Sequence, residues 1–535
     1  MAKISDLIAQ GRRDEVWQTY CGFLDLSLSE FMSIQERLLR EQLHFIAASP
    51  LARSILGDKI PGSVEEFRKQ VRLTTYADYA PYLDQKREDV LAAKPVAWAH
   101  TSGRSGQFKW APYTARAFAN LGAGIMTAFI LCAARRRGEV RLEPGDVLVY
   151  NGATRPYISG FALYAVPERF DFRFVPPPER AEKMSFQERI EEGFKVGLRT
   201  GIDLIGSITA VMMKVGERFA QGGRSMRLSA AMLHPAVFMR IGRAMVRSRL
   251  EGRPMLPKDI WKIKGMVVGG TDTGIYRERL AYYWGVEPHE SYGCTEITPV
   301  MATQAWTRKG LYFLPDAGFY EFIPEEEWAH SKQDPTYIPR TILLDEVKTG
   351  ERYEIVVTNF HGGPFLRYRL YDLVRFVSLR DDEAGIALPS MVFEGRTNDL
   401  IDLAGFTGLI DEKLVWQALE NAGITYEDWL VRKEVLADHT ALHLYIELKD
   451  GRSADVVAQQ VHRAMQRLNP FYADIEKLLE YVPLQVTALS PGTFARYMAA
   501  QQAAGADLAH LKPPHMNAPD HIIAELLKHS RNGAV

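Results

Sequence analysis

Cysteine is scarce in this sequence, which has three, Cys21, Cys132 and Cys294, among 535 residues. So few cysteines exclude a disulfide framework and a zinc site built from cysteine side chains. Net charge is also small, because 65 lysine and arginine residues are balanced by 66 aspartate and glutamate residues. A chain without a large excess of positive charge has no general attraction for nucleic acid or for an anionic membrane. We therefore expect a cytoplasmic protein that binds neither.

Long apolar segments are missing as well. The longest uncharged one, LGAGIMTAFILCAA at residues 121–134, has 14 residues, whereas a transmembrane helix needs about 20. The segment MAKISDLIAQGRRDEVW carries charges every few residues and lacks the apolar core of a signal peptide. Three arginines follow residue 134 directly, as they would flank a single membrane anchor. The short length nevertheless favours a buried core helix.

What is present is typical of a globular protein. Hydrophobic residues make up 47% and charged residues 24%, a balance that excludes a disordered chain. Apolar residues three and four positions apart predict helices in the first hundred residues, and further helices are expected at 186–199 and 230–250. Short apolar segments at 147–150 and 266–268 end in Asn-Gly and Gly-Gly, which is typical of buried strands.

Strands are predicted to dominate the next part of the chain. Between residues 311 and 394 a sheet is favoured by LYFLP, FYEFIP, TILLDEV, YEIVVTNF, VRFVSL and SMVFEG. After Gly395 the pattern predicts a helix at 410–422, a strand at 442–448, a helix at 455–468 and a strand at 479–486.

These elements predict an α/β protein. A large N-terminal domain, residues 1–395, would combine mixed sheets with helices, and a small, mobile α+β domain would occupy residues 404–535. The polar segment at 396–403 can absorb backbone rotation, and we interpret it as a hinge between them.

The first motif that suggests chemistry is TSGRSGQFK at 101–109, inside a polar loop predicted at 100–110. Glycine lets backbone amides approach a phosphate, hydroxyl groups add donors, and the lysine supplies positive charge. The spacing is not that of a Walker A loop. A Ser/Gly surface turn with a solvated lysine is the alternative. The candidate residues are Thr101, Ser102, Gly103, Ser105, Gly106 and Lys109.

The second motif is SYGCTE at 291–296, which follows the predicted strand that ends in Gly-Gly-Thr. A tyrosine ring can stack on a purine, a threonine hydroxyl can donate to a phosphate, and a glutamate is a hard oxygen ligand that suits magnesium. The alternative is a loop whose glutamate faces solvent. The candidate residues are Tyr292, Gly293, Thr295 and Glu296, with Gly270 and Thr271 at the end of the preceding strand.

Three further segments carry candidate side chains. Asp372, in RYRLYDLVR at 367–375, can accept hydrogen bonds from both hydroxyls of a ribose, although alternating charges at a strand edge would look similar. Arg396 belongs to the proposed hinge. Lys512 lies in AHLKPPH, where the prolines would hold it more firmly than a helix face would. An ordinary exposed lysine is the alternative there.

In their order along the chain, these segments resemble the motifs of the adenylate-forming superfamily, which includes acyl-CoA synthetases, luciferases and the adenylation domains of peptide synthetases. TSGRSGQFK resembles that superfamily's T-S-G-[ST]-[ST]-G-x-P-K. Within the superfamily the chain looks most like the Gretchen Hagen acyl-acid amido synthetases. YEIVVTNFHGGPFLRYRLYD resembles their segment ending in Tyr-Arg-x-Gly-Asp, and SPGTFARYMAAQQAAGADLAHLKPPHM resembles their C-terminal segment.

The resemblance implies a role for most of the candidate residues. For the phosphates, it places Thr101, Ser102 and Lys109 in a phosphate loop, Thr295 at the α-phosphate and Glu296 on magnesium. For the nucleoside, it places Gly270 and Tyr292 beside adenine, Asp372 on the ribose hydroxyls, and Arg396 near them at the hinge. Lys512 would lie between the carboxylate and phosphate oxygens during adenylation. The sequence departs from the family pattern at three places. Arg104 replaces a Ser or Thr, Tyr371 replaces the Gly before the ribose aspartate, and AGFTGLIDEKL at 404–414 replaces a Gly-Glu-Lys-Leu pattern.

The activity that the resemblance implies is an ATP- and Mg²⁺-dependent ligase. It would convert a small carboxylic acid into acyl-AMP and pyrophosphate, and then transfer the acyl group to an amine, expected to be an amino acid. An acid:CoA ligase with the same first half-reaction is one alternative. A catalytically silent nucleotide-binding homologue, which Arg104 and Tyr371 favour, is the other. The sequence leaves the acid, the acceptor and the oligomeric state open.

Overall fold

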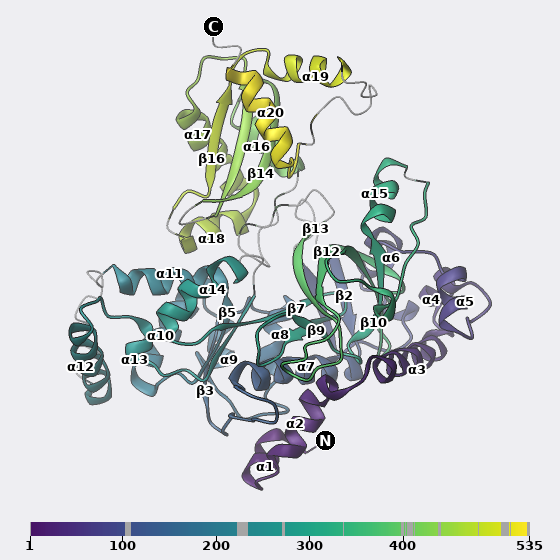
Figure 1. The fold of residues 1–535 in the computed structure, drawn as a ribbon, viewed down its shortest axis with the longest axis vertical. Helices are drawn as coiled ribbons and strands as arrows, with labels where there is room; N and C mark the ends of the chain where they lie inside the picture. The colour runs from purple at the N-terminus through teal and green to yellow at the C-terminus, as the bar shows by residue number, and fades with distance from the viewer. Residues whose placement is uncertain are drawn as a thin grey trace. The chain divides into compact units, whose positions relative to one another are not determined.

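The computed structural model describes residues 2–101, 109–221, 234–269, 273–334, 336–396, 401, 403, 410, 412–436, 440–479, 481–503, 513 and 515–531. Backbone contacts divide these residues into two compact units, a large one up to residue 396 and a small one from residue 401 onward. Both units combine strands with helices (Figure 1). The α/β fold class predicted from the sequence, a large domain of mixed sheet and helix with a small α+β domain, is confirmed.

Helices form the N-terminal part of the large unit, as predicted. The longest of them starts with a capping box, in which the Ser27 hydroxyl accepts from the Glu30 amide and the Glu30 carboxylate accepts from the Ser27 amide. Ser49 and Ser63 cap two other helices through their hydroxyls. The elements are α1 (Ile4–Ala9), α2 (Arg13–Cys21), η1 (Gly22–Asp25), α3 (Leu28–Ile46), α4 (Pro50–Leu56), α5 (Val64–Gln70), α6 (Tyr76–Leu83) and η2 (Glu88–Val90).

One sheet of eleven strands organises the described part of the large unit. Its parallel part has the order β4-β3-β5-β6-β7, and its antiparallel part continues as β7-β8-β9-β13-β12-β11-β10. The strands are β3 (Val147–Tyr150), β4 (Arg173–Val175), β5 (Leu204–Ile208), β6 (Gly265–Gly269), β7 (Pro288–Cys294), β8 (Thr298–Gln304), β9 (Leu311–Phe313), β10 (Gly318–Pro324), β11 (Arg352–Asn359), β12 (Tyr368–Ser378) and β13 (Ser390–Arg396). The strands predicted at 147–150 and 266–268 are confirmed.

Helices pack against the parallel part of this sheet. Helix α7 contacts β6, β7 and β8, while α10 contacts β3 and β4, α11 contacts β5, and α14 contacts β7. This cover explains why β3 and β6 consist almost entirely of apolar residues. The described helices between residues 115 and 333, which include α15 against β10 and β11 of the antiparallel part, are α7 (Ala115–Ala133), α8 (Ile158–Ala165), α9 (Pro178–Ala181), α10 (Phe186–Thr200), α11 (Thr209–Ala220), α12 (Pro235–Leu250), α13 (Pro257–Ile260), α14 (Thr273–Trp284) and α15 (Glu325–Gln333).

Helix α7 contains most of the longest apolar segment of the sequence. It starts at Ala115, where the Thr114 hydroxyl accepts from the Ala117 amide and caps the helix. By length and composition this helix is able to cross a membrane, but 61% of its most apolar window is buried inside the protein. Residues 124–133 of the helix are all buried. The prediction of a buried core helix is therefore confirmed.

Three details differ from the sequence prediction. Both ends of the predicted loop 100–110 are strands, because β1 (Ala97–Thr101) and β2 (Lys109–Tyr113) pair antiparallel. The strand predicted at 341–347 is wrong, since the Glu346 carboxylate accepts from the Leu343 amide and closes a turn, η5 (Leu344–Glu346). The strand predicted at 479–486 starts only at Leu484, because residue 479 still belongs to a helix.

The small unit has a three-stranded sheet in the order β14-β15-β16. Strands β14 (Tyr426–Val435) and β15 (Thr440–Leu448) are antiparallel, and β16 (Leu484–Leu489) is parallel to β15. Its helices are α16 (Glu412–Asn421), α17 (Ala454–Leu468), α18 (Pro470–Leu479), α19 (Thr493–Ala503) and α20 (Asp520–Arg531). A parallel pair of strands needs a long crossover connection, which α17 and α18 supply here.

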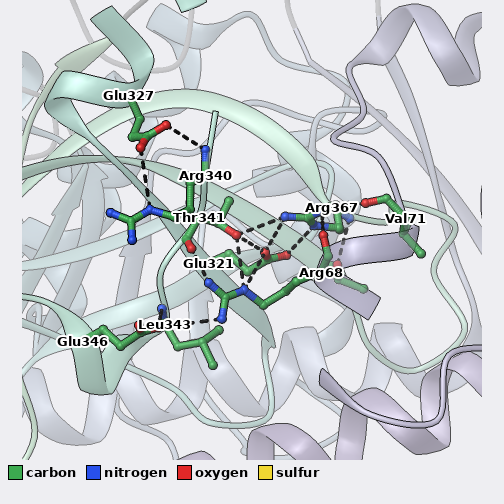
Figure 2. A network of polar contacts seen from close by, with 10 residues as sticks. Arg68, Val71, Glu321, Glu327, Arg340, Thr341, Leu343, Glu346 and Arg367 are labelled. Atoms are coloured by element: carbon green, nitrogen blue, oxygen red, sulfur yellow. Dashed lines mark hydrogen bonds and ion pairs between the residues drawn. The ribbon is translucent and has the colours of Figure 1, made fainter. Parts of the chain in front are cut away.

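A buried ion pair fixes the start of β12 (Figure 2). The Arg367 guanidinium donates to both oxygens of Glu321, at 2.8 and 3.0 Å. Its other donors reach the backbone carbonyls of Arg68 and Val71, each at 2.6 Å, and the Thr341 hydroxyl at 3.0 Å. Arg367 is 5% exposed and Glu321 is fully buried. All five N–H groups of the guanidinium thus have acceptors, which is the condition for burying such a charge.

Candidate functional site

Three distant segments meet at one cluster of polar side chains in the large unit. The Tyr368 hydroxyl donates to Glu296 Oε1 at 2.9 Å and accepts from Lys109 Nζ at 3.2 Å. Lys109 Nζ also lies 3.7 Å from Glu296 Oε1. Lys109 is the first residue of β2, Glu296 lies in the turn between β7 and β8, and Tyr368 is the first residue of β12. We call Lys109, Glu296 and Tyr368 the lysine–glutamate cluster.

Glu296 does not face solvent, because the residue is 8% exposed. Burial first, and the Glu296 charge second, raise the pKa of the Tyr368 hydroxyl well above its usual value. Tyr368 therefore stays protonated and donates to the carboxylate. The alternative of a solvent-facing glutamate at the second motif is excluded.

A second contact joins the same strands. The Tyr292 hydroxyl donates to Asp372 Oδ2 at 2.8 Å, and both residues are buried. Strands β7 and β12 are not neighbours, since β8, β9 and β13 lie between them in the hydrogen-bonding order. The antiparallel part of the sheet must therefore curl until side chains of β7 and β12 touch. Since β12 lies between β11 and β13, Asp372 is not on an edge strand, which excludes the alternative at the third motif.

Strand β12 bulges where it presents Asp372. Arg369 pairs with Val356 and Leu373 pairs with Glu354, so residues 370–372 stand opposite one residue of β11. Such a bulge redirects side chains out of the regular alternation of a strand. Within it Tyr371 has φ of 60°, a left-handed conformation that glycine adopts without strain. The departure from the family's glycine thus retains the backbone shape that glycine favours.

Glycine 293 has a packing role. A Cβ atom there would lie 2.4 Å from the carbonyl oxygen of Thr298 and 2.4 Å from the carbonyl carbon of Pro299, on the facing strand β8. The β7-β8 hairpin therefore has room for glycine alone at this position. Beside it, the backbone carbonyl of Thr295 accepts from the Tyr113 hydroxyl at 2.8 Å, which ties the turn of the hairpin to β2.

The remaining candidates are placed only in part. Thr101 ends β1 opposite Lys109, and the backbone of Arg396 pairs with that of Asp372. Ser102, Gly103, Ser105, Gly106, Gly270, Thr271 and Lys512 lie outside the described residues. Of the described candidates, the structure brings Lys109 together with Glu296, and Tyr292 together with Asp372.

Two contributors were missed by sequence reasoning. Tyr368 connects Lys109 to Glu296, and Arg367 anchors the strand on which Tyr368 and Asp372 lie. Both lie inside the third motif, so the motif itself was the available signal. The pattern of charged and aromatic residues did not reveal which of them bind one another.

Among the described residues there is no group of three or more His, Cys, Asp or Glu side chains that could hold a metal ion.

Comparison with known proteins gives one family. Three models of this family match the chain: the GH3 family N-terminal domain at residues 22–151, the GH3 family central domain at 311–396 and the GH3 family C-terminal domain at 412–520. A jasmonoyl–L-amino acid synthetase of Nicotiana attenuata is 26% identical over 280 residues, covering 49% of this chain and 44% of that protein. A 4-substituted benzoates–glutamate ligase of Arabidopsis thaliana is 23% identical, covering 91% of this chain and 93% of that protein. The match to the first of these relatives thus spans less than half of its length.

Solved structures show the same fold. An AtGH3.15 acyl acid amido synthetase in complex with 2,4-DB superposes with a TM-score of 0.52 at 18% identity, covering 95% of each chain. A 2-hydroxyisobutyryl-CoA ligase in complex with 2-HIB-AMP and CoA superposes with a TM-score of 0.56 at 16% identity, covering 90% of this chain and 93% of that one. At these identities the likeness concerns the fold.

The conformation of Tyr371 makes a testable prediction. A non-glycine residue in the left-handed region costs roughly 1–2 kcal/mol, and glycine in a strand costs roughly 0.5–1 kcal/mol in chain entropy. Tyr371→Gly should therefore change the stability of the large unit by no more than about 1.5 kcal/mol. Leu373→Gly, two residues along the same strand, serves as the control and should lose more. Urea denaturation of both variants checks this, and equal losses would contradict the strain at Tyr371.

Proposed function

This chain belongs to the GH3 family, and we propose that it is an ATP-dependent ligase that joins a small carboxylic acid to an amine through an acyl-adenylate. Family models along more than half of the chain support this proposal. The relatives are named as synthetases or ligases that act on acids and amino acids. The observation that carries the proposal is a pair of contacts between the same segments: Tyr368 of β12 joins Glu296 to Lys109, and Asp372, four residues further along β12, binds Tyr292 of β7.

The chemistry explains why such a site needs paired charges. A carboxylate does not react with an amine at neutral pH, because its leaving group would be hydroxide or oxide. Attack of one carboxylate oxygen on the α-phosphorus of ATP forms a carbon–oxygen–phosphorus link and releases pyrophosphate, so that AMP becomes the leaving group. The amine nitrogen then attacks the acyl carbon, loses a proton and expels AMP. Since two anions meet in the first step, fixed cations must offset their charge.

Each residue of the cluster has a place in this scheme. Lys109 would meet phosphate oxygens, and Tyr368 would hold the Glu296 carboxylate in one orientation through its hydroxyl. Asp372, which already accepts from Tyr292, would accept from the ribose hydroxyls. Lys512 would enter from the small domain and stabilise charge that develops during adenylation. Holding the carboxylate and the phosphate in line is worth about 7–11 kcal/mol at best.

We also propose that the site uses magnesium, held by Glu296. Magnesium in nucleotide sites typically takes one or two protein carboxylates and completes its shell with phosphate oxygens and water. A buried carboxylate beside a lysine, outside any described group of three or more His, Cys, Asp or Glu side chains, fits that pattern. The bound cation would offset negative charge on the phosphate oxygens.

As for localisation, the small number of cysteines supports a reducing, cytoplasmic setting.

The experiment that tests the function measures pyrophosphate release from ATP with benzoate, 4-substituted benzoates, indole-3-acetate or jasmonate, each alone, with single amino acids, or with CoA. We expect at least one acid to release pyrophosphate and an amino acid to accelerate AMP release. Acceleration by CoA alone would make the chain an acid:CoA ligase. ATP binding without pyrophosphate release from any acid would favour a silent nucleotide-binding protein.

Lys512→Ala should lower the kcat of pyrophosphate release by a factor on the order of 10²–10³, the effect of removing one group that stabilises transition-state charge. The Kd for ATP should change little, because the lysine meets charge that grows during the reaction. Lys528→Ala, an exposed lysine on α20, is the control and should behave like the parent. An unchanged kcat for Lys512→Ala would remove Lys512 from the adenylation step.

Glu296→Gln should raise the magnesium concentration needed for half-maximal pyrophosphate release by about tenfold or more. The reason is that a neutral amide is a poorer ligand for a hard cation than a carboxylate is. Glu290→Gln is the control, because Glu290 lies on β7, six residues before Glu296, and is bonded to Arg277. If both variants keep the magnesium dependence of the parent, Glu296 does not bind the metal.

A further inference from the structure

The segment that follows Lys512 is fastened to the small domain. The backbone carbonyl of His515 accepts from the Val431 amide at 2.6 Å, and the Asn517 amide donates to the Val431 carbonyl at 2.8 Å. Met516 thereby forms a parallel bridge with Val431. In the sheet order β14-β15-β16, β14 is an edge strand, and this segment covers its outer edge. Met516 and Ala518 are buried at 3% exposure, so their side chains add apolar contact.

One side chain of this segment is held on both ring nitrogens. His515 Nδ1 lies 2.5 Å from Glu412 Oε1, and His515 Nε2 lies 2.8 Å from Asp428 Oδ1. The imidazole also stacks on the buried Trp429 ring, with centroids 4.5 Å apart and planes 17° from parallel. Two carboxylates that both accept from one ring require both nitrogens to carry protons, which is the charged form of histidine. His515 therefore joins three elements: its own segment, β14 and the first residue of α16.

We propose that His515 is a positioning residue for Lys512, which precedes it by three residues in the sequence, and that its charged ring, clamped between Glu412 and Asp428, holds residues 515–517 at the edge of β14. This rests on the proposed function, in which Lys512 serves adenylation. Three residues of extended chain span at most about 11 Å. Fixing His515 thus confines the Lys512 backbone to within about that distance of the clamp. A lysine on a fastened segment loses less entropy when it enters the site than one on a free loop.

The clamp depends on pH in a defined direction. Burial lowers the pKa of His515, but the hydrogen bonds and charges of Asp428 and Glu412 more than offset this, so the pKa is raised above the usual value of a histidine. Among the described residues, Glu412 from α16 and Asp428 from β14 are the charged groups in contact with the ring. A group whose pKa rises on folding stabilises the protein fully below its unfolded pKa and loses that effect as the pH rises through its folded pKa. The charged hydrogen bonds from His515 to Glu412 and Asp428 are therefore formed at pH 6 and weaken at alkaline pH.

The direct test is hydrogen exchange of the Val431 and Asn517 amides in the full chain, corrected for the intrinsic rate at each pH. In the parent, protection should fall between pH 6 and pH 9. His515→Gln, which cannot carry charge, should lose about tenfold or more of the protection at pH 6 and show no further dependence on this titration. His515→Arg, which stays charged and can donate to both carboxylates, should keep protection up to pH 9.

Two further variants guard against a general loss of structure. Asp428→Asn should weaken protection through the opposite partner of the same contact. His521→Gln, an exposed histidine on α20, should leave protection unchanged at every pH. Protection that is independent of pH in the parent and equal in His515→Gln would overturn the clamp. So would equal losses in His515→Gln and His521→Gln.

The effect on Lys512 is read from pyrophosphate release with whichever acid of the panel is most active. His515→Gln should lower kcat about tenfold at pH 6 while the KM for ATP stays within twofold, and His515→Arg should restore kcat. Lost protection with an unchanged kcat would overturn the positioning role. If the parent releases no pyrophosphate with any acid, the proposed function fails, whereas the clamp is still decided by hydrogen exchange.

Discussion

The structure of the large unit depends on burying one charge pair completely. Arg367 and Glu321 have almost no contact with solvent, and removing such charges from water is costly unless every donor and acceptor is satisfied. Here the five guanidinium N–H groups find five oxygens, contributed by Arg68, Val71, Thr341 and Glu321. These partners come from the helical N-terminal part, from β10 and from the segment after α15. The pair therefore fixes the position of β12 against three separate parts of the chain.

That anchoring matters because the site begins at the very next residue. Tyr368 contacts Glu296, and four residues further on Asp372 contacts Tyr292. A second buried pair, Arg369 with Glu354, holds the strand between these two contacts, with distances of 2.7 and 2.9 Å. Because the start and middle of β12 are fixed by these ion pairs, the strand keeps its pairing register despite the bulge and the left-handed conformation of Tyr371. These charge pairs thus supply a fixed frame for the polar groups of the candidate site.

The sequence predicted much of this, and its omissions share a cause. Residue types and order were enough to select Lys109, Glu296 and Asp372 and to predict the α/β class. The strand ends at 100–110 were missed because Ser and Gly suggest a turn but do not mark where the flanking strands stop. The alternating charges of RYRLYDLVR are equally compatible with a solvated edge. Only the partners Glu321 and Glu354, which precede the motif along the chain, show that these arginines are buried. Tyr368 was missed because its contact arises from the curl of the sheet, which brings together strands that do not pair.

The ion pairs that hold β12 in place differ from the Lys109–Glu296 pair of the candidate site in burial and in hydrogen bonding. Arg367 with Glu321 and Arg369 with Glu354 are hydrogen-bonded through two nitrogens, and the four side chains are 0–16% exposed. Lys109 is 37% exposed in its side chain and lies 3.7 Å from Glu296, too far for a hydrogen bond. An ion pair that is loose and open to water contributes little to stability. In the proposed function Lys109 would lose little beyond its hydrogen bond to Tyr368 when it turns toward a phosphate, whereas breaking either arginine pair would leave a charge buried without its partner. The proposed adenylate-forming site would use both kinds of pair, one to hold the geometry and one that a nucleotide can displace.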